Sequence, residues 1–319
     1  MNKDANHIAI IIPYFGQWPE WIDVYFYSCR NNNHIDWIFF TDCLIPQTKS
    51  SNLFFYPIDF EEYCKNTSNK LNIHFSPQCA YKLCDLRPFY GIVHADILKA
   101  YDFWGFGDLD IIWGNLKKFY PDDLLSKYDV FSTHNDRVSG HLTIIRNIQK
   151  YNHLCLQIKD WQAKLCSEIN EQLDEAAFSQ LLFPESRIIG KIYRQVLMKH
   201  LGWRRARNIY CSIFPLIHSL LRTRKRKLFF KEQYTTPILS GDGHISKNDS
   251  ENWLYKDNKI YNLRTGREHI YLHFMLYKKN NVRPGSYYWN EDFYSLDSTF
   301  DYSKGVIVDT KGISPNANK

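Results

Sequence analysis

The chain has 319 residues, with 40 Lys and Arg against 34 Asp and Glu, and a formal net charge of +6. At 44% hydrophobic and 23% charged residues, it is not a disordered, collagen-like or low-complexity chain. The length accommodates one large domain or two small ones. None of the eight cysteines forms a Cys-x-x-Cys pair, so zinc-ribbon and thioredoxin-like sites lack their spacing and we expect free, mostly buried thiols.

The positive charge is concentrated in one segment. Nine of the 40 basic residues lie between Trp203 and Lys231, where there is no Asp or Glu, which leaves 31 basic against 34 acidic residues elsewhere. A charge so localised argues against a nucleic-acid partner, whose binding surface is usually broadly basic. Apolar residues surround the basic run Arg222–Lys227. We therefore predict that 203–231 docks on an anionic membrane surface; a core helix with a solvated basic loop is the alternative.

No segment predicts insertion into a membrane. Met1–His7 is polar and has no apolar signal-peptide core, and no apolar run approaches the roughly 20 residues needed to span a bilayer. We expect a cytoplasmic protein that is either soluble or peripheral on the inner face of the cytoplasmic membrane.

The first third of the chain alternates between strand and helix patterns. The apolar run His7–Pro13 predicts a strand buried on both faces, and Trp18–Cys29 has helical spacing of its large apolar residues. Asp36–Phe40 and Leu53–Tyr56 are the next predicted strands. This alternation favours the α/β class with a doubly wound sheet.

Mixed elements are predicted in the remainder. Strand-like segments are Tyr101–Phe106, Ile111–Gly114, Tyr128–Thr133, His141–Arg146 and the short Ile270–Tyr277; helical segments are Tyr81–Ala100, Asn147–Leu156 and Asp174–Leu182. The tail 301–319 has few large apolar groups, and we expect it to pack loosely.

Asp108-Leu-Asp110 is the motif that carries chemistry. On an extended backbone, two carboxylates two residues apart point the same way, so both would reach one Mg²⁺ or Mn²⁺. Aromatic residues precede the motif and Ile111-Ile-Trp113 follows it. Carboxylates in such an apolar stretch are costly to bury without a counter-cation, which favours a metal site over a surface turn.

Several segments resemble a bacterial glycosyltransferase-like family of capsule and O-antigen gene clusters. They are Ile11-Ile-Pro-Tyr-Phe-Gly-Gln-Trp-Pro-Glu-Trp21, Asp36-Trp-Ile-Phe-Phe-Thr-Asp42, Tyr81-Lys-Leu-Cys-Asp-Leu-Arg-Pro88, Tyr101-Asp-Phe-Trp-Gly-Phe-Gly-Asp-Leu-Asp110 and Ser139-Gly-His141. The resemblance covers residues 8–185 well and Tyr271–Phe274 more loosely. It implies a GT-A fold, a single Rossmann-like domain that binds a nucleotide sugar, with an Asp-x-Asp metal motif.

Donor-binding residues follow from this resemblance. Pro13, Tyr14 and Phe15, at the end of the first strand, would contact the base, and Asp42 would bind uracil or ribose. Cofactor-binding roles are also predicted for Lys82, Asp85, Arg87, Asp108 and Lys278, with Lys82 and Arg87 on the diphosphate. For each group a plain turn or a solvated helix face is the alternative.

Asp174 and Glu175 are the predicted catalytic acids beside the sugar, and His141 is expected to line the acceptor site. Helix capping alone would also explain Asp174. A hydrogen-bonded polar residue near the surface is the alternative for His141. His273, with Asp108 and Asp110, is predicted to complete the metal site, by similarity in character to glycogenin-like enzymes; a core histidine is the alternative.

The sequence thus predicts a metal-dependent transferase that moves a sugar from a nucleotide sugar, a UDP-sugar by preference, to a lipid-linked bacterial glycan. A nucleotidyltransferase is an alternative, for which Pro13–Gly16 is a poor phosphate loop; a non-catalytic glycan- or lipid-binding protein is another. The predicted divisions are a catalytic core at 1–202, a docking segment at 203–231, a completing part at 232–300 and the tail at 301–319.

Overall fold

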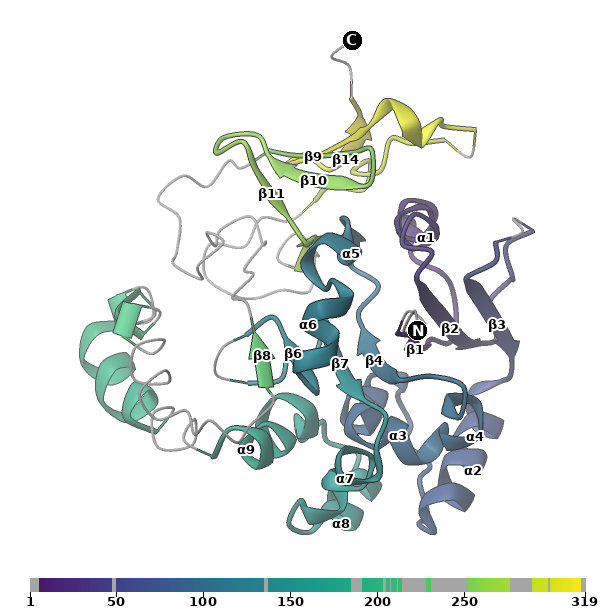
Figure 1. Ribbon diagram of the computed structural model, residues 1–319, viewed down its shortest axis with the longest axis vertical. Helices are drawn as coiled ribbons and strands as arrows, with labels where there is room; N and C mark the ends of the chain where they lie inside the picture. The colour runs from purple at the N-terminus through teal and green to yellow at the C-terminus, as the bar shows by residue number, and fades with distance from the viewer. Residues whose placement is uncertain are drawn as a thin grey trace.

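A seven-stranded sheet forms the centre of the molecule in the computed structural model, which describes residues 6–47, 50–134, 137–184, 191–202, 205–206, 208–210, 212–213, 228–230, 252–275, 289–297 and 299–316 (Figure 1). The strand order is β3-β2-β1-β4-β7-β6-β8. The bounds are β1 Ile8–Pro13, β2 Ile35–Thr41, β3 Leu53–Pro57, β4 Phe103–Gly107, β6 Val130–Ser132, β7 Leu142–Arg146 and β8 Leu228–Phe230.

Parallel pairing dominates one half of this sheet. Strands β3, β2, β1 and β4 run parallel, and β7 is antiparallel to both β4 and β6. β1 lies between two parallel neighbours and is buried along Ile8–Ile12, which explains its unbroken apolar sequence. The predicted α/β class is confirmed.

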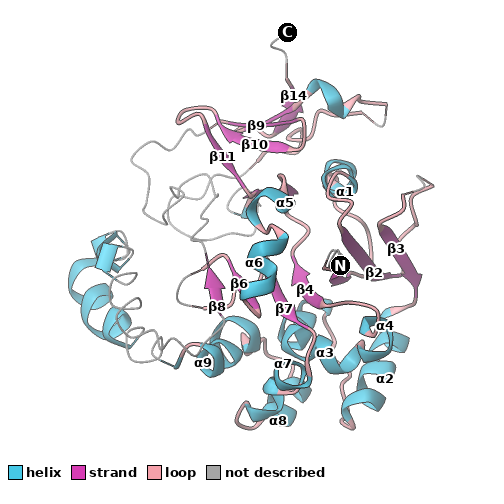
Figure 2. Cartoon of the chain, viewed as in Figure 1, coloured by secondary structure: helices cyan, strands magenta, loops and turns pink. Residues whose placement is uncertain are grey.

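Helices cover both faces of the sheet (Figure 2). Alternate strand residues face two separate cores: Ile11 and Trp104 contribute to one, and Ile10 and Phe103 to the other. The α-helices are α1 Ile22–Arg30, α2 Phe60–Leu71, α3 Tyr90–Val93, α4 Ala95–Leu98, α5 Leu116–Phe119, α6 Asp122–Lys127, α7 Gln149–Asn152, α8 Trp161–Cys166 and α9 Ser179–Leu182. The 3-10 helices are η1 Ala80–Phe89, η2 Leu154–Gln157 and η6 Tyr302–Lys304, and the π-helices are η3 Leu173–Phe178 and η4 Tyr193–Met198.

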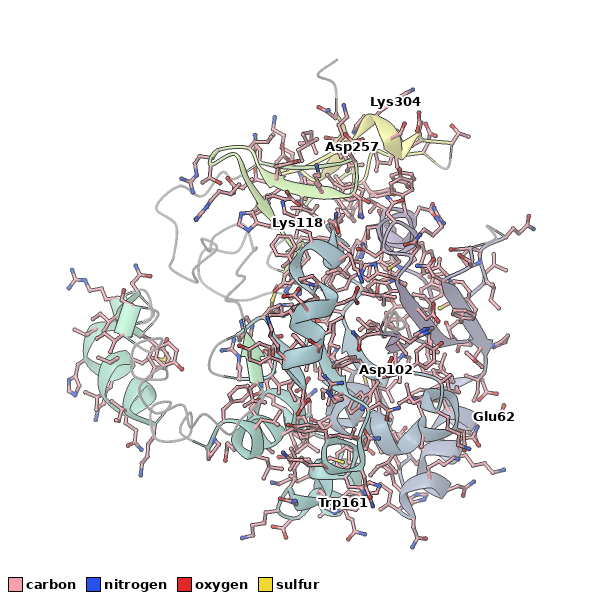
Figure 3. The ribbon with its side chains drawn as sticks, in the orientation of Figure 1. Glu62, Asp102, Lys118, Trp161, Asp257 and Lys304 are labelled. Atoms are coloured by element: carbon pink, nitrogen blue, oxygen red, sulfur yellow. The ribbon has the colours of Figure 1, made fainter. Side chains whose placement is uncertain are left out.

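The C-terminal residues form a second, five-stranded sheet in the order β11-β10-β9-β13-β14. Figure 3 shows Asp257 and Lys304 in this part, at the opposite end of the molecule from Trp161. Its strands are β9 Trp253–Lys256, β10 Lys259–Asn262, β11 Arg267–His269, β13 Val306–Val308 and β14 Ile313–Pro315. Val306, Val308 and Ile313 are fully buried in its core, so the described part of the tail is packed, against our expectation of a loose segment.

A two-stranded sheet joins a segment near residue 272 to the strand that follows β4 in sequence. In it β12 (Tyr271–His273) pairs antiparallel with β5 (Ile111–Trp113), placing His273 opposite Ile111. β12 confirms the short strand predicted near residue 270. This pairing brings two segments 160 residues apart in sequence into contact beside Asp110.

The predicted docking segment falls largely outside the described residues, including the whole basic run Arg222–Lys227. Its last part differs from the prediction: Leu228–Phe230 is strand β8, which pairs with β6, and Leu228 is buried. Among the helices that the structure describes, none combines the length and apolar character of a membrane span. The seven cysteines in the described ranges are free, and Cys29, Cys43, Cys64 and Cys155 are buried.

Candidate active site

The candidate site lies where parallel strands of the central sheet end. β2, β1 and β4 are neighbours, so their carboxyl ends meet at one edge of the sheet, where ligands bind in α/β folds. Asp42 follows β2, Tyr14 follows β1 and Asp108 follows β4. The three residues therefore lie at one edge of the sheet.

Asp108, Asp110 and His273 form a cluster with the donor set of a metal site. One ligand atom from each lies within 4.8 Å of the others. His273 Nε2 is 3.4 Å from Asp110 Oδ1 and 3.9 Å from Asp108 Oδ2. Two carboxylates and one imidazole suit Mn²⁺, and carboxylate oxygens suit Mg²⁺.

Backbone hydrogen bonds fix each residue of the Asp108–Asp110 turn. Asp108 N donates to His141 O at 3.3 Å, and Phe274 N donates to Asp110 O at 3.0 Å. Trp21 Nε1 donates to Leu109 O at 2.9 Å. Three distant segments thus hold the two carboxylates in place before any ligand binds, which is the preorganisation that a binding site requires.

His273 provides the test of whether these residues fit a metal. Its Nε2 is buried and has no hydrogen-bond partner among the residues that the structure describes, although it faces both carboxylates. A buried polar atom without a partner is costly, and a cation bound between the three side chains would satisfy it. The residues present therefore fit a divalent cation.

Arg87 links this cluster to Asp174. Its guanidinium pairs with Asp108 Oδ1 through Nη2, and its Nη1 lies 3.1 Å from Asp174 Oδ2. Burial disfavours the charged guanidinium, but the two carboxylates outweigh it and raise the pKa of Arg87. Arg87 thus remains charged between two segments that are far apart in sequence.

Asp174 is a buried acid of the site whose pKa is raised. Burial raises its pKa to about 6, and Arg87 opposes that shift. The negative charge of Glu175 adds to the raised pKa. A buried carboxyl group that titrates near neutral pH, beside a metal-ligand cluster, is a common feature of catalytic sites.

Gly140 brings a backbone segment against these acids. Its N–H donates to Glu175 Oε1 at 3.2 Å, and Glu175 Oε2 lies 3.7 Å from Arg137 Nε. An added Cβ at Gly140 would lie 2.7 Å from Arg87 Nη1 and 3.2 Å from Asp174 Oδ2. Only glycine allows this approach without moving the Arg87–Asp174 pair.

Comparison with known proteins identifies the family. The model of a family of unknown function, DUF6625, matches residues 10–300. The chain belongs to DUF6625. No curated protein matches it.

Solved structures of several glycosyltransferases are distantly similar to this DUF6625 member. The galactosyltransferase LgtC, determined with donor and acceptor sugar analogs, is 10% identical, with 54% of this chain and 71% of LgtC covered and a TM-score of 0.31. The glycosyltransferase GlyE of Streptococcus pneumoniae is 12% identical (71% and 54% covered, TM-score 0.34), and mouse xyloside xylosyltransferase 1 is 10% identical (70% and 96%, TM-score 0.31). The chain spans about half the length of GlyE.

Two donor-site predictions need correction in this DUF6625 protein. Lys82 and Asp85 form a buried ion pair with Nζ and Oδ2 2.9 Å apart, and Lys82 is only 2% exposed. Lys82 Nζ also donates to the carbonyls of Lys164 and Ile169. Both charged groups are enclosed, so neither is available to a diphosphate.

His141 also differs from its predicted role. It is buried, its Nε2 lies 2.5 Å from the Tyr271 hydroxyl and 3.1 Å from Thr133 Oγ1, and its ring is 4.5 Å from that of His273. Burial lowers its pKa well below the usual range, and His273 adds to this shift. His141 is a neutral ring packed against a candidate metal ligand and does not line an open acceptor site.

The predicted base-binding residues form the turn after β1. The Tyr14 ring stacks on Trp18 at 5.3 Å, whereas Phe15 packs against Phe60 in the core. Asp42 is exposed, and its Oδ1 accepts the Gly16 N–H at 2.7 Å, which fixes a turn where Gly16 has φ +101°. Pro13 ends β1. Lys278 lies outside the described residues.

Sequence reasoning missed Trp21, Arg137 and Gly140. An isolated Gly beside a His carries no chemical signal by itself, and the partner of Arg137 is 38 residues away.

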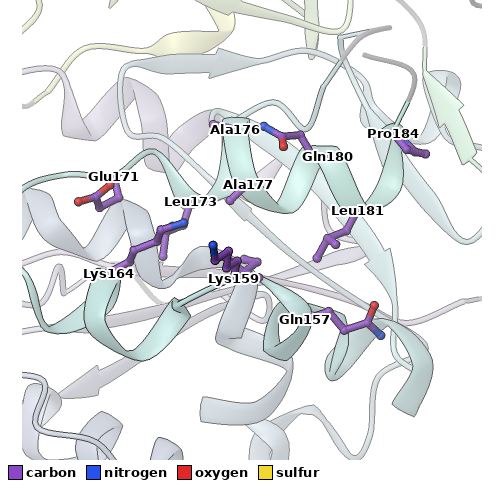
Figure 4. Close-up of a pocket in the computed structure, with 11 residues that line it drawn as sticks. Gln157, Lys159, Lys164, Glu171, Leu173, Ala176, Ala177, Gln180, Leu181 and Pro184 are labelled. Atoms are coloured by element: carbon purple, nitrogen blue, oxygen red, sulfur yellow. The ribbon is translucent and has the colours of Figure 1, made fainter. Parts of the chain in front are cut away.

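A cavity of about 740 Å³ lies between the 157–164 segment and η3–α9 (Figure 4). Leu173, Ala176 and Ala177 line it, but none of the site's charged residues does.

Proposed function

We propose that this protein is a metal-dependent glycosyltransferase of the GT-A type. The observation that carries the proposal is the Asp108–Asp110–His273 cluster, with the unpartnered His273 Nε2 directed at two carboxylates at the carboxyl end of β4. A nucleotide sugar is a substrate class that combines a need for a divalent cation with a binding site at this edge of an α/β sheet.

Asp108, Asp110 and His273 would hold Mn²⁺ or Mg²⁺. When bound there, the cation supplies Lewis-acid neutralisation of charge on a diphosphate leaving group. Asp108 Oδ1 pairs with Arg87, whereas Oδ2 faces His273. We propose that Arg87, next to the metal cluster, also binds this diphosphate, with Asp42 and Tyr14 on the nucleoside side.

Asp174 and Glu175 are the residues proposed to act at the sugar. In the transfer, the bond between the sugar C1 and the diphosphate oxygen breaks, the acceptor hydroxyl oxygen bonds to C1, and the hydroxyl proton leaves. With a pKa of about 6, Asp174 is ionised in most molecules at neutral pH and would accept that proton in an inverting reaction. In a retaining reaction the same carboxylate would stabilise the positive charge on the sugar.

A lipid-linked bacterial glycan is the proposed acceptor. The concentration of basic residues between Trp203 and Lys231 supports this choice, because basic and apolar residues together favour an anionic bilayer, at about 1 kcal/mol for each basic residue near the surface. We propose that the enzyme works in the cytoplasm, at the inner face of the membrane where such an acceptor is held.

The test is a screen of nucleotide sugars for Mn²⁺-dependent hydrolysis. Wild-type protein should release the nucleoside diphosphate only with metal, and Asp110→Asn should not. Asp129→Asn is the matched control and should retain activity, because it alters a different ion pair, between Asp129 just before β6 and Arg146 at the end of β7. Hydrolysis by Asp110→Asn at the wild-type rate, with and without chelator, would refute the metal role.

Calorimetry with UDP separates the remaining alternatives. A UDP-sugar transferase should bind UDP only when Mn²⁺ is present. Binding of UDP without metal, or of a glycan with no nucleotide binding, would instead favour a non-catalytic protein. Turnover of a nucleoside triphosphate would favour the nucleotidyltransferase.

A further inference from the structure

The Lys82–Asp85 ion pair makes hydrogen bonds to a single segment of the chain, residues 164–173. In addition to its contacts with the Lys164 and Ile169 carbonyls at 2.7 and 2.5 Å, Lys82 Nζ donates to Ser167 Oγ at 3.2 Å. Asp85 accepts the N–H groups of Glu171 and Leu173, each at 2.8 Å. Every one of these bonds reaches the segment 164–173.

A buried ion pair is weak evidence for stability, because desolvation of the two charges offsets much of their attraction. Here the pair restricts conformation. Asp85 holds the N–H groups on both sides of Gln172, which has a φ of +53°, a region that non-glycine residues rarely adopt. The ion pair thus fixes the backbone from Glu171 to Leu173, the residue at which η3 begins.

Asp174 and Glu175 follow immediately. The first N–H of η3, that of Leu173, is bonded to Asp85, and the next residue is Asp174. Arg87, which pairs with Asp174, lies on η1 together with Lys82 and Asp85. One helix therefore holds η3 at two places, by a backbone clamp and by a side-chain pair.

We infer that Lys82 and Asp85 are positioning residues: they set the Asp174 and Glu175 carboxylates against Arg87 and the Gly140 N–H. Their catalytic consequence rests on the proposed function. The positioning itself does not, because the Gly140 N–H bonds to Glu175 whether or not the protein transfers a sugar.

Amide hydrogen exchange of the full-length protein tests this directly. In Asp85→Asn, exchange at Glu171 and Leu173 should accelerate about ten- to a hundredfold, because both amides lose a charged acceptor. Exchange at Gly140 should also accelerate, by about threefold or more, because its acceptor Glu175 moves with η3. If the Lys82–Asp85 pair merely stabilised the 164–173 segment, the exchange rate of the Gly140 amide would be unchanged.

Asp129→Asn is again the matched control. Asp129 is buried and pairs with Arg146 at 2.6 Å, so this change tests the general cost of removing a buried charge. It should leave exchange at 140 and 171–173 at the wild-type rate. If Asp85→Asn does not fold, Lys82→Met with Asp85→Asn removes both charges while position 85 keeps a single acceptor oxygen, and the same acceleration is expected.

Turnover provides a second, separate measurement. If wild-type protein hydrolyses a nucleotide sugar, Asp85→Asn should lower kcat, and adding Asp174→Asn should lower it little further, because coupled residues are not additive. Unchanged exchange at Gly140, or additive losses in kcat, would overturn the positioning role. Absence of turnover in wild type together with accelerated exchange at Gly140 would overturn the proposed function and leave the positioning role standing.

Discussion

Replacing Asp174 by Asn should change how stability depends on pH. The Asp174 side chain is 5% exposed, and its pKa in the folded protein is about 6 against an ordinary 3.8. A folded-state pKa above the unfolded value means that the native protein keeps this proton after the unfolded chain has lost it. The free energy of unfolding therefore falls as pH rises from about 4 to about 6.

The magnitude follows from the size of the shift. About two pKa units at 1.36 kcal/mol each give roughly 3 kcal/mol, and the near-complete burial of the group calls for no discount for solvent screening. Near pH 4 the Asp174 carboxyl is mostly protonated and similar in shape and charge to the Asn amide. The two proteins should therefore have similar stability at pH 4, and Asp174→Asn should be more stable by about 3 kcal/mol at pH 7.

Urea denaturation followed by Trp fluorescence, in chelator at pH 4, 5, 6 and 7, would measure this difference. Subtracting the free energy of unfolding of Asp174→Asn from that of the wild-type protein at each pH removes the contributions of groups that titrate in both proteins. Glu175→Gln is the graded control: it removes a charge that raises the Asp174 pKa, so its pH dependence should be weaker than that of wild type. If wild-type protein instead gains stability relative to Asp174→Asn as pH rises, the Arg87 contact outweighs burial and the reasoning is refuted.

Three further predictions address other parts of the molecule. Gly140→Ala should lower stability by about 1–3 kcal/mol, by thermal unfolding, and should reduce turnover, because its Cβ displaces Arg87 Nη1; an unchanged melting temperature would contradict this. His273→Ala should weaken Mn²⁺ binding in calorimetry by at least tenfold while the apo-protein stays folded, and equal affinity would remove His273 from the metal site. Neutralising Arg224, Lys225, Arg226 and Lys227 should reduce co-sedimentation with anionic liposomes but not with neutral ones.

The local pattern of apolar residues was sufficient to predict the strands of the amino-terminal half of the fold. Runs such as His7–Pro13 are apolar because a parallel strand is buried on both faces, and this signal needs no knowledge of distant residues. Helix α2 was overlooked despite a readable cap, since Asp59 accepts the Glu62 N–H at 2.7 Å in the manner of a helix start. The five-stranded sheet was missed because its strands are three or four residues long.

Part of the site was predictable, because residue type and spacing alone indicate some of its charged residues. Asp108 and Asp110 are separated by a single residue, and Arg87 and Asp174 carry charge, so residue type and spacing pointed to them. The same signal failed at Lys82 and Asp85, because a charged side chain in a helix looks alike whether it faces a ligand or a buried turn. Burial and hydrogen-bond partners, which spacing does not encode, separate the two cases.

The charge balance of the assembled site is compatible with the proposed cation. Asp108, Asp110, Asp174 and Glu175 bring four carboxylates together, and Arg87 and Arg137 are the guanidinium groups paired with them among the described residues. A divalent cation offsets the remaining negative charge. Because Arg87 uses only one oxygen of Asp108, the other stays on the His273 side, so binding of that cation leaves the link to Asp174 intact. The proposed metal would thereby be linked to the placement of Asp174 through one carboxylate, that of Asp108.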